Sequence, residues 1–290
     1  MKIAAAALAI ALFAATEASA ADYCSQTTIV ATAQMASDPN GLALIPATLG
    51  TQQQTMLVDT GAAISELTDV AADQMQLAIF PNQFGMYNPA GNFSEKAVAV
   101  SPFGIGNVST KTYTFRVAKL TPDGAAGTIG ADVLRAYDID FDFGGGKVNL
   151  VSPDHCVGKV IYWKASAVAV VPMTVAPDGR IVLPLTIDGH QVNALLDTGS
   201  ATSSITADAA RNLLKAQSSA VGMELPVQAL ALDAISLTNP KLSVVKELKD
   251  ASSKPLDPSL GADMTLGMNV LKHLHLYVAY REQRLYITPK

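Results

Sequence analysis

The chain has 290 residues, which is long enough for two domains of ordinary size that each bury a hydrophobic core. Apolar residues make up 49% of the sequence and charged residues 16%, so the composition is that of a globular protein and excludes a largely disordered one. The formal net charge is -5 and no run of Lys and Arg occurs, so we expect no nucleic-acid partner, which would require a basic surface.

The first 20 residues have the pattern of a secretory signal peptide. Lys2 precedes an apolar stretch at 3–15, and an Ala-Ser-Ala cleavage site follows at 18–20. The alternative, a membrane anchor, would need about 20 apolar residues, and this stretch is shorter and is followed by Glu17. We therefore expect an exported protein, periplasmic or secreted, that has no membrane anchor after cleavage.

Both cysteines of the sequence, Cys24 and Cys156, lie after the predicted cleavage site. In an oxidising compartment an even pair of cysteines favours a disulfide, which here would tie the mature N-terminus to the middle of the chain. Closing a loop of this length would stabilise the fold by about 4 to 5 kcal/mol in the chain-entropy model. The alternative is two buried free thiols.

Most of the remaining chain has the pattern of β-strands separated by turns. Apolar segments at 42–49 and 181–187 follow glycine turns, and strand patterns return at 137–151 and 274–287. Many strands and few helices predict an all-β fold.

The tripeptide Asp-Thr-Gly occurs twice, at 59–61 and 197–199, and each copy follows three apolar residues. An apolar run that ends in Asp and a glycine turn is typical of a buried strand that presents one carboxylate at its end. Two such strands would bring two carboxylates together. The sequence therefore indicates a hydrolase with Asp59 and Asp197 as its candidate catalytic residues.

These tripeptides belong to an internal duplication. Asp59 and Asp197 lie 138 positions apart, and the same spacing separates Pro39-Asn40-Gly41 from Pro177-Asp178-Gly179. A constant spacing between several motifs indicates two copies of one fold.

The duplication sets the predicted domain boundaries. We expect a signal peptide at 1–20, an N-terminal lobe at 21–155 and a C-terminal lobe at 156–290, with the connector near 152–159. In each copy a threonine, Thr68 and Thr206 respectively, is placed to cap a short helix.

A second motif follows each Asp-Thr-Gly. Thr-Ile-Gly at 128–130 and Thr-Leu-Gly at 265–267 lie 71 and 70 positions after their aspartates, counted to the glycine. Gly130 and Gly267 would permit a close approach of backbone to backbone, although either one alone is also typical of an ordinary core strand.

With two motifs, each present twice and in the same order, the sequence resembles the pepsin/retropepsin-like aspartic peptidases over about residues 28–290. The resemblance implies two lobes on one chain, each a closed β-barrel-like unit with one or two short helices. It also implies that Asp59 and Asp197 meet in the cleft between the lobes, and that the enzyme is a monomer that needs no cofactor and no metal.

The residues around the two aspartates have supporting roles that the resemblance favours. The hydroxyls of Thr60 and Thr198 can donate hydrogen bonds across the lobe interface, and Gly61 and Gly199 allow a tight turn. A plain turn after a strand would explain one such motif but not two.

The two copies differ at the next position. Ser200 could donate a hydrogen bond to the outer oxygen of Asp197, whereas Ala62 cannot do so for Asp59. We therefore predict that Asp197 is the ionised partner, and that the pair keeps its shared proton to a higher pH than the pair of pepsin.

A substrate-covering hairpin is a further feature of the family. Residues 85–93 occupy the corresponding place, with Tyr87 as the candidate aromatic residue and Gly91 in the predicted turn. An exposed hairpin tyrosine is the alternative for Tyr87. A peptide substrate would bind in an extended conformation along this hairpin.

Two other groups of ionisable residues have structural interpretations. Asp138, Asp140 and Asp142 alternate with apolar residues, which predicts a half-exposed strand rather than a calcium site. His273 and His275 are predicted to alternate on a strand as a partly buried pair, because no Cys or HExxH partner for zinc accompanies them.

The sequence thus predicts an exported aspartic endopeptidase that hydrolyses peptide bonds through water activated between two aspartates. The alternative from another class is a non-catalytic peptide-binding or protein-binding module that retains the fold. Two intact motifs disfavour that alternative, because a binding module does not need a second buried carboxylate, which is costly.

Overall fold

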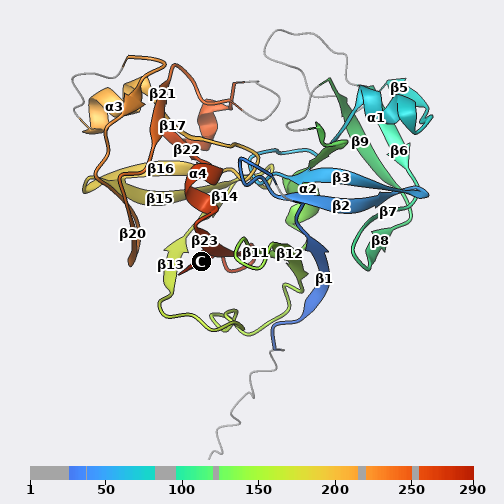
Figure 1. Ribbon diagram of the computed structural model, residues 1–290, viewed down its shortest axis with the longest axis horizontal. Helices are drawn as coiled ribbons and strands as arrows, with labels where there is room; N and C mark the ends of the chain where they lie inside the picture. The colour runs from blue at the N-terminus through green and yellow to red at the C-terminus, as the bar shows by residue number, and fades with distance from the viewer. Residues whose placement is uncertain (1–25, 37, 82–95, 120–123, 215–219, 250–254) are drawn as a thin grey trace, which may run out of the picture.

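A computed structural model describes residues 26–36, 38–81, 96–119, 124–214, 220–249 and 255–290 of the chain (Figure 1). Strands make up 47% of the structure and helices 10%, so the predicted all-β class is confirmed. The predicted signal peptide at 1–20, Cys24, and the hairpin residues Tyr87 and Gly91 lie outside the described residues.

The first half of the chain forms one nine-stranded sheet of order β5-β6-β9-β4-β10-β3-β2-β7-β8. Its strands are β2 (Leu44–Leu49), β3 (Gln52–Val58), β4 (Glu66–Thr68), β5 (Ile79–Pro81), β6 (Lys96–Val100), β7 (Phe103–Ile105), β8 (Val108–Thr110), β9 (Tyr113–Ala118) and β10 (Gly127–Ile129).

The second half forms another nine-stranded sheet, of order β18-β21-β17-β22-β16-β15-β19-β20, with β14 paired to β15. Its strands are β14 (Thr174–Val175), β15 (Ile181–Ile187), β16 (His190–Leu196), β17 (Ser203–Thr206), β18 (Glu224–Leu225), β19 (Ala229–Leu232), β20 (Ile235–Thr238), β21 (Leu242–Val245) and β22 (Met264–Leu266).

The duplication inferred from the sequence is visible in these two sheets. The strand order β4-β10-β3-β2 of the first half recurs as β17-β22-β16-β15 in the second. In both halves the strand that leads to Asp-Thr-Gly lies parallel to the strand that leads to the second motif, with Val58 beside Ile129 and Leu196 beside Leu266.

Short helices follow four of the strands, and two of these helices begin at the predicted threonine caps. They are α1 (Asp69–Gln74), α2 (Ala131–Leu134), α3 (Ala207–Leu214) and α4 (Met268–Leu271), with the 3-10 turn η2 (Pro258–Leu260). The Thr68 hydroxyl accepts a hydrogen bond from the Ala71 N–H at 3.1 Å, and the Thr206 hydroxyl accepts one from the Ala209 N–H at 3.2 Å.

A third sheet joins the two halves, and its order is β1-β12-β11-β23-β24-β13. Its strands are β1 (Ile29–Gln34), β11 (Asp138–Asp142), β12 (Lys147–Val151), β13 (Ala169–Pro172), β23 (Leu274–Ala279) and β24 (Arg284–Pro289). The halves meet where β11 pairs antiparallel with β23, with Phe141 opposite Leu276. Figure 1 shows this sheet below the two larger ones.

The prediction of a half-exposed strand at 138–142 is wrong. Asp138 and Asp140 are 0% and 1% exposed, and only Asp142 is partly accessible. The cause is the connector at 152–168, which lies over one face of the third sheet and packs Val160 among its buried side chains. An alternation of polar and apolar residues shows which residues share a face of a strand. It does not show whether a later segment of the chain covers the polar face.

Both buried carboxylates have partners. Asp140 lies 2.5 Å from Nε2 of His275, accepts a hydrogen bond from Asn149 at 2.8 Å, and accepts one from the Tyr162 hydroxyl. Asp138 lies 2.6 Å from Nε2 of His155. Burial raises the pKa of the Asp138 carboxyl, and the hydrogen bonds to His155 oppose this shift.

The two predicted strand histidines have different positions. His275 is buried on β23 and stacks on Trp163 with ring centroids 3.9 Å apart. His273 is exposed in the turn before β23, so the predicted strand pair does not form.

We expect Asp140→Ala to lower the free energy of unfolding by about 2 to 4 kcal/mol, because it leaves several buried donors without an acceptor. Urea denaturation of the variant measures the change. Asp208→Ala, which removes an exposed carboxylate on α3, serves as the control and should change stability by less than about 0.5 kcal/mol. If the two variants were equally stable, the hydrogen bonds to Asp140 would not stabilise the fold as expected.

Candidate active site

Two adjacent strands hold each aspartate of the Asp-Thr-Gly motifs. Asp59 follows β3, and its N–H donates to the Ile129 carbonyl of β10 at 3.0 Å. Asp197 follows β16, and its N–H donates to the Leu266 carbonyl of β22 at 3.1 Å. Both aspartates therefore continue a parallel strand pair at the same point of the two equivalent sheets.

The turn after each aspartate points its N–H groups at the carboxylate. Oδ1 of Asp59 accepts hydrogen bonds from the N–H of Gly61 at 2.8 Å and from that of Ala62 at 3.0 Å. Oδ1 of Asp197 accepts one from Gly199 at 3.0 Å. Each motif therefore orients its own carboxyl group.

The two carboxyl groups lie against each other's glycine turn. A Cβ atom added to Gly61 would be 2.5 Å from Cγ of Asp197, and one added to Gly199 would be 2.2 Å from Cγ of Asp59. Both distances are shorter than any real contact, so only glycine fits at either position. The structure thus brings the two predicted aspartates together.

The threonines of the two motifs form a reciprocal set of buried hydrogen bonds. The Thr60 hydroxyl donates to the Leu196 carbonyl at 2.7 Å and accepts from the Thr198 N–H at 3.1 Å. The Thr198 hydroxyl donates to the Val58 carbonyl at 2.7 Å and accepts from the Thr60 N–H at 3.1 Å. We call these four bonds the threonine lock. The predicted bonds between the halves are present, and each hydroxyl uses its donor and an acceptor position.

The second motif packs directly under each aspartate loop. A Cβ atom on Gly130 would be 2.9 Å from the Ala62 carbonyl, and one on Gly267 would be 2.4 Å from the Thr202 carbonyl. The close backbone approach that the sequence allowed is therefore present in both halves.

In each half, a serine that follows the Asp-Thr-Gly loop bonds to the second motif and to a side-chain oxygen just after that motif, and the sequence did not predict these residues. The Ser65 hydroxyl accepts from the Gly130 N–H at 2.9 Å and donates to Asp132 at 2.7 Å. In the second half Ser203 accepts from Gly267 at 2.9 Å and donates to Asn269 at 2.7 Å. The internal repeat could have identified them, because Ser65 and Ser203 lie 138 positions apart and Asp132 and Asn269 lie 137 positions apart.

The pair of carboxyl groups changes the acidity of Asp197. Complete burial, the negative charge of Asp59 and a side-chain hydrogen bond to Asp59 together raise the pKa of Asp197 well above its usual range. Backbone N–H groups of Gly199 and Ser200 oppose this shift. The close approach of the two carboxyl groups therefore favours a state in which the pair holds a proton.

This result corrects the predicted role of Ser200. Its hydroxyl donates to the Thr202 carbonyl at 2.8 Å and therefore does not donate to Asp197. The prediction that Asp197 is the ionised partner loses its physical basis, because the stabilising bond is not made. A serine after Asp-Thr-Gly can bond either to the carboxylate or to its own loop, and the sequence does not distinguish them.

Cys156 is disulfide-bonded, as predicted, and its predicted partner Cys24 lies outside the described residues. Within the described part of the chain, no group of three or more His, Cys, Asp or Glu side chains is arranged to hold a metal ion. No helix among these residues is long and apolar enough to cross a membrane.

No known family model matches this sequence, and no curated protein matches it either.

We expect Thr198→Val to destabilise the protein by about 2 to 5 kcal/mol, because it leaves the Val58 carbonyl and the Thr60 N–H buried without their partner. Chemical denaturation measures this loss. Thr198→Ser keeps the hydroxyl and is the matched control, with an expected loss of about 1 kcal/mol or less. If serine and valine were equally costly, methyl packing rather than the threonine lock would be the source of stability.

The raised pKa of Asp197 also predicts a pH dependence of stability. The folded state holds this proton more tightly than the unfolded state, so its contribution is complete below the unfolded pKa and is lost as pH rises through the folded pKa. Asp197→Asn removes this loss, so the variant should be more stable than the wild type at neutral pH. Thermal unfolding of both proteins at acid and neutral pH tests this prediction. If the wild type were more stable than Asp197→Asn at neutral pH, the prediction would be contradicted.

Proposed function

We propose that this protein is an exported aspartic endopeptidase, acting in the periplasm or outside the cell, with the two-lobed pepsin/retropepsin-like fold. The observation that supports it most is that the buried carboxyl groups of Asp59 and Asp197 lie together, which raises the pKa of Asp197. Two carboxyl groups in contact with one proton between them are the acid and base that hydrolysis of an unactivated amide requires.

In the proposed reaction, Asp59 acts as the base and Asp197 as the acid. The ionised Asp59 takes a proton from a water molecule, and the resulting hydroxide attacks the peptide carbonyl carbon. Protonated Asp197 donates its proton to the carbonyl oxygen, and a neutral tetrahedral diol forms. When the diol collapses, Asp59 gives its proton to the leaving nitrogen and Asp197 takes one from a diol hydroxyl.

The surroundings of the pair support this reaction in two ways. The threonine lock and the glycine turns fix both carboxyl groups before substrate arrives, so little reorganisation is needed during the reaction. Burial keeps bulk water from screening each carboxyl group from the charge of the other, which keeps the pKa of Asp197 raised. We propose a monomer that binds an extended peptide and needs no cofactor.

The aspartates can be tested by substitutions that keep their shape. We expect Asp59→Asn and Asp197→Asn each to lower kcat for a peptide library by about 100- to 10,000-fold or more, because each removes the base or the acid. Asp140→Asn, a buried aspartate of the third sheet, is the control and should retain most of the activity. Cleavage that survives either of the first two substitutions would exclude the proposed pair, and tight peptide binding by a wild type that cleaves nothing would indicate a binding module.

The pH profile tests the shared proton. Because the pKa of Asp197 is raised, the active form with one proton should persist above the usual carboxyl range of about pH 4. We expect kcat/KM to remain substantial above that range and to fall as Asp197 ionises at higher pH. Activity confined to pH values below about 4 would contradict the proposed role of Asp197.

A further inference from the structure

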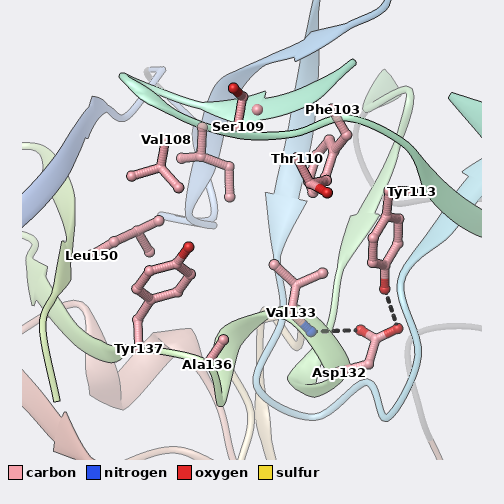
Figure 2. A pocket seen from close by; sticks show the side chains of 12 residues that line it. Phe103, Val108, Ser109, Thr110, Tyr113, Asp132, Val133, Ala136, Tyr137 and Leu150 are labelled. Carbon is pink, nitrogen blue, oxygen red and sulfur yellow. Dashed lines mark hydrogen bonds between the residues drawn. The ribbon is translucent and has the colours of Figure 1, made fainter. Parts of the chain in front are cut away.

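A cavity of about 220 Å³ lies in the first half of the chain, away from the two Asp-Thr-Gly loops. It is bounded by the β7–β8 hairpin, the start of β9, α2 with the turn after it, and Leu150 of β12, as Figure 2 shows. No lining residue belongs to either aspartate loop, so this cavity is distinct from the candidate active site.

The walls of the cavity are mainly aromatic and aliphatic. Phe103 and Tyr113 lie side by side with ring centroids 5.2 Å apart, and behind this wall Phe115, which does not line the cavity, packs against the Phe103 ring at 5.0 Å. Ile105, Val108 and Leu150 add aliphatic surface. Such walls favour an aromatic occupant, which can pack edge-to-face against the existing rings.

Tyr137 is one of the polar residues that line this largely apolar space. Figure 2 shows the Tyr137 side chain with its hydroxyl directed into the cavity, opposite Val108. The equivalent residue of the second half, 137 positions later, is Leu274, which is only 3% exposed. The first half thus has a hydroxyl where the second half has an aliphatic core residue.

The volume and lining of the cavity define the chemistry of its occupant. An apolar cavity of about 150 Å³ accepts benzene, so 220 Å³ accommodates one aromatic ring with substituents. The lining contains no Lys, Arg or His, and its one carboxylate, Asp132, already accepts hydrogen bonds from Tyr113, Ser65 and Val133. A charged ligand would therefore find no partner there.

We propose that this cavity is a binding site for a small neutral aromatic molecule with one hydrogen-bonding group, which would pair with the Tyr137 hydroxyl. A phenol or an indole has this chemistry. The site follows the usual pattern of ligand pockets, in which apolar walls supply affinity and a few polar groups fix orientation.

A chain of hydrogen bonds connects the cavity to the loop of Asp59. The Tyr113 hydroxyl donates to Asp132 at 2.5 Å, Asp132 accepts from the Ser65 hydroxyl, and Ser65 accepts from the Gly130 N–H. The next residue, Ala131, donates its N–H to the Ala62 carbonyl at 2.8 Å. A ligand that displaces the Tyr113 ring should therefore perturb Ser65 and Gly130, which lie outside the cavity.

Titration of the mature chain with p-cresol and indole, followed by amide NMR spectra, tests this proposal without reference to peptidase activity. We expect saturable binding with a Kd on the order of 0.1 to 1 mM, which is typical of ligands of this size. Amide signals of the lining residues and of Ser65 and Gly130 should shift together.

Three variants examine the site. Ala136 is exposed at the rim, so Ala136→Trp should fill the cavity and abolish binding, while Ala136→Ser leaves it open and should bind like the wild type. Tyr137→Phe should weaken p-cresol binding about threefold to tenfold by removing the hydroxyl. Failure to saturate up to the solubility limit, or unchanged binding by Ala136→Trp, would overturn the site. Shifts confined to the lining residues would overturn its connection to the Asp59 loop.

Discussion

The mutual contact of the two Asp-Thr-Gly loops is the constraint on which the rest of this structure depends. Each glycine gives room to the carboxyl group of the other half, and each threonine hydroxyl satisfies backbone groups of the other half. Neither half can satisfy its own threonine, because the partners of each buried threonine hydroxyl belong to the other half. The raised pKa of Asp197 is a consequence of the same contact, since burial and the charge of Asp59 act together.

Much of this arrangement could be predicted from the sequence, because it is local and is repeated. The strands before Asp59 and Asp197, the threonine caps and the glycines of the second motif all follow from short patterns at a constant spacing. These patterns concern covalent neighbours or backbone conformation, which composition and periodicity report well. Their repetition at a constant spacing is what distinguishes these patterns from chance, since one motif alone would fit an ordinary turn.

The features that could not be predicted depend on segments far apart in the chain. The burial of Asp138 and Asp140 arises from the connector that covers them, and no alternation pattern within β11 contains that information. The hydroxyl of Ser200 had two possible acceptors, and only the folded loop decides in favour of the Thr202 carbonyl. The link from Ser65 to Asp132 was present in the repeat spacing but had no sequence motif to identify it.

The continuous sheet through β11 and β23 has a consequence for how the molecule responds to dilution. A site made from two separate copies of one half would assemble only above the dissociation constant of the pair. Here the strands of both halves are hydrogen-bonded in one sheet and belong to one polypeptide, so the local concentration of each copy around the other is fixed by the chain. Asp59 and Asp197 therefore stay together however dilute the protein becomes.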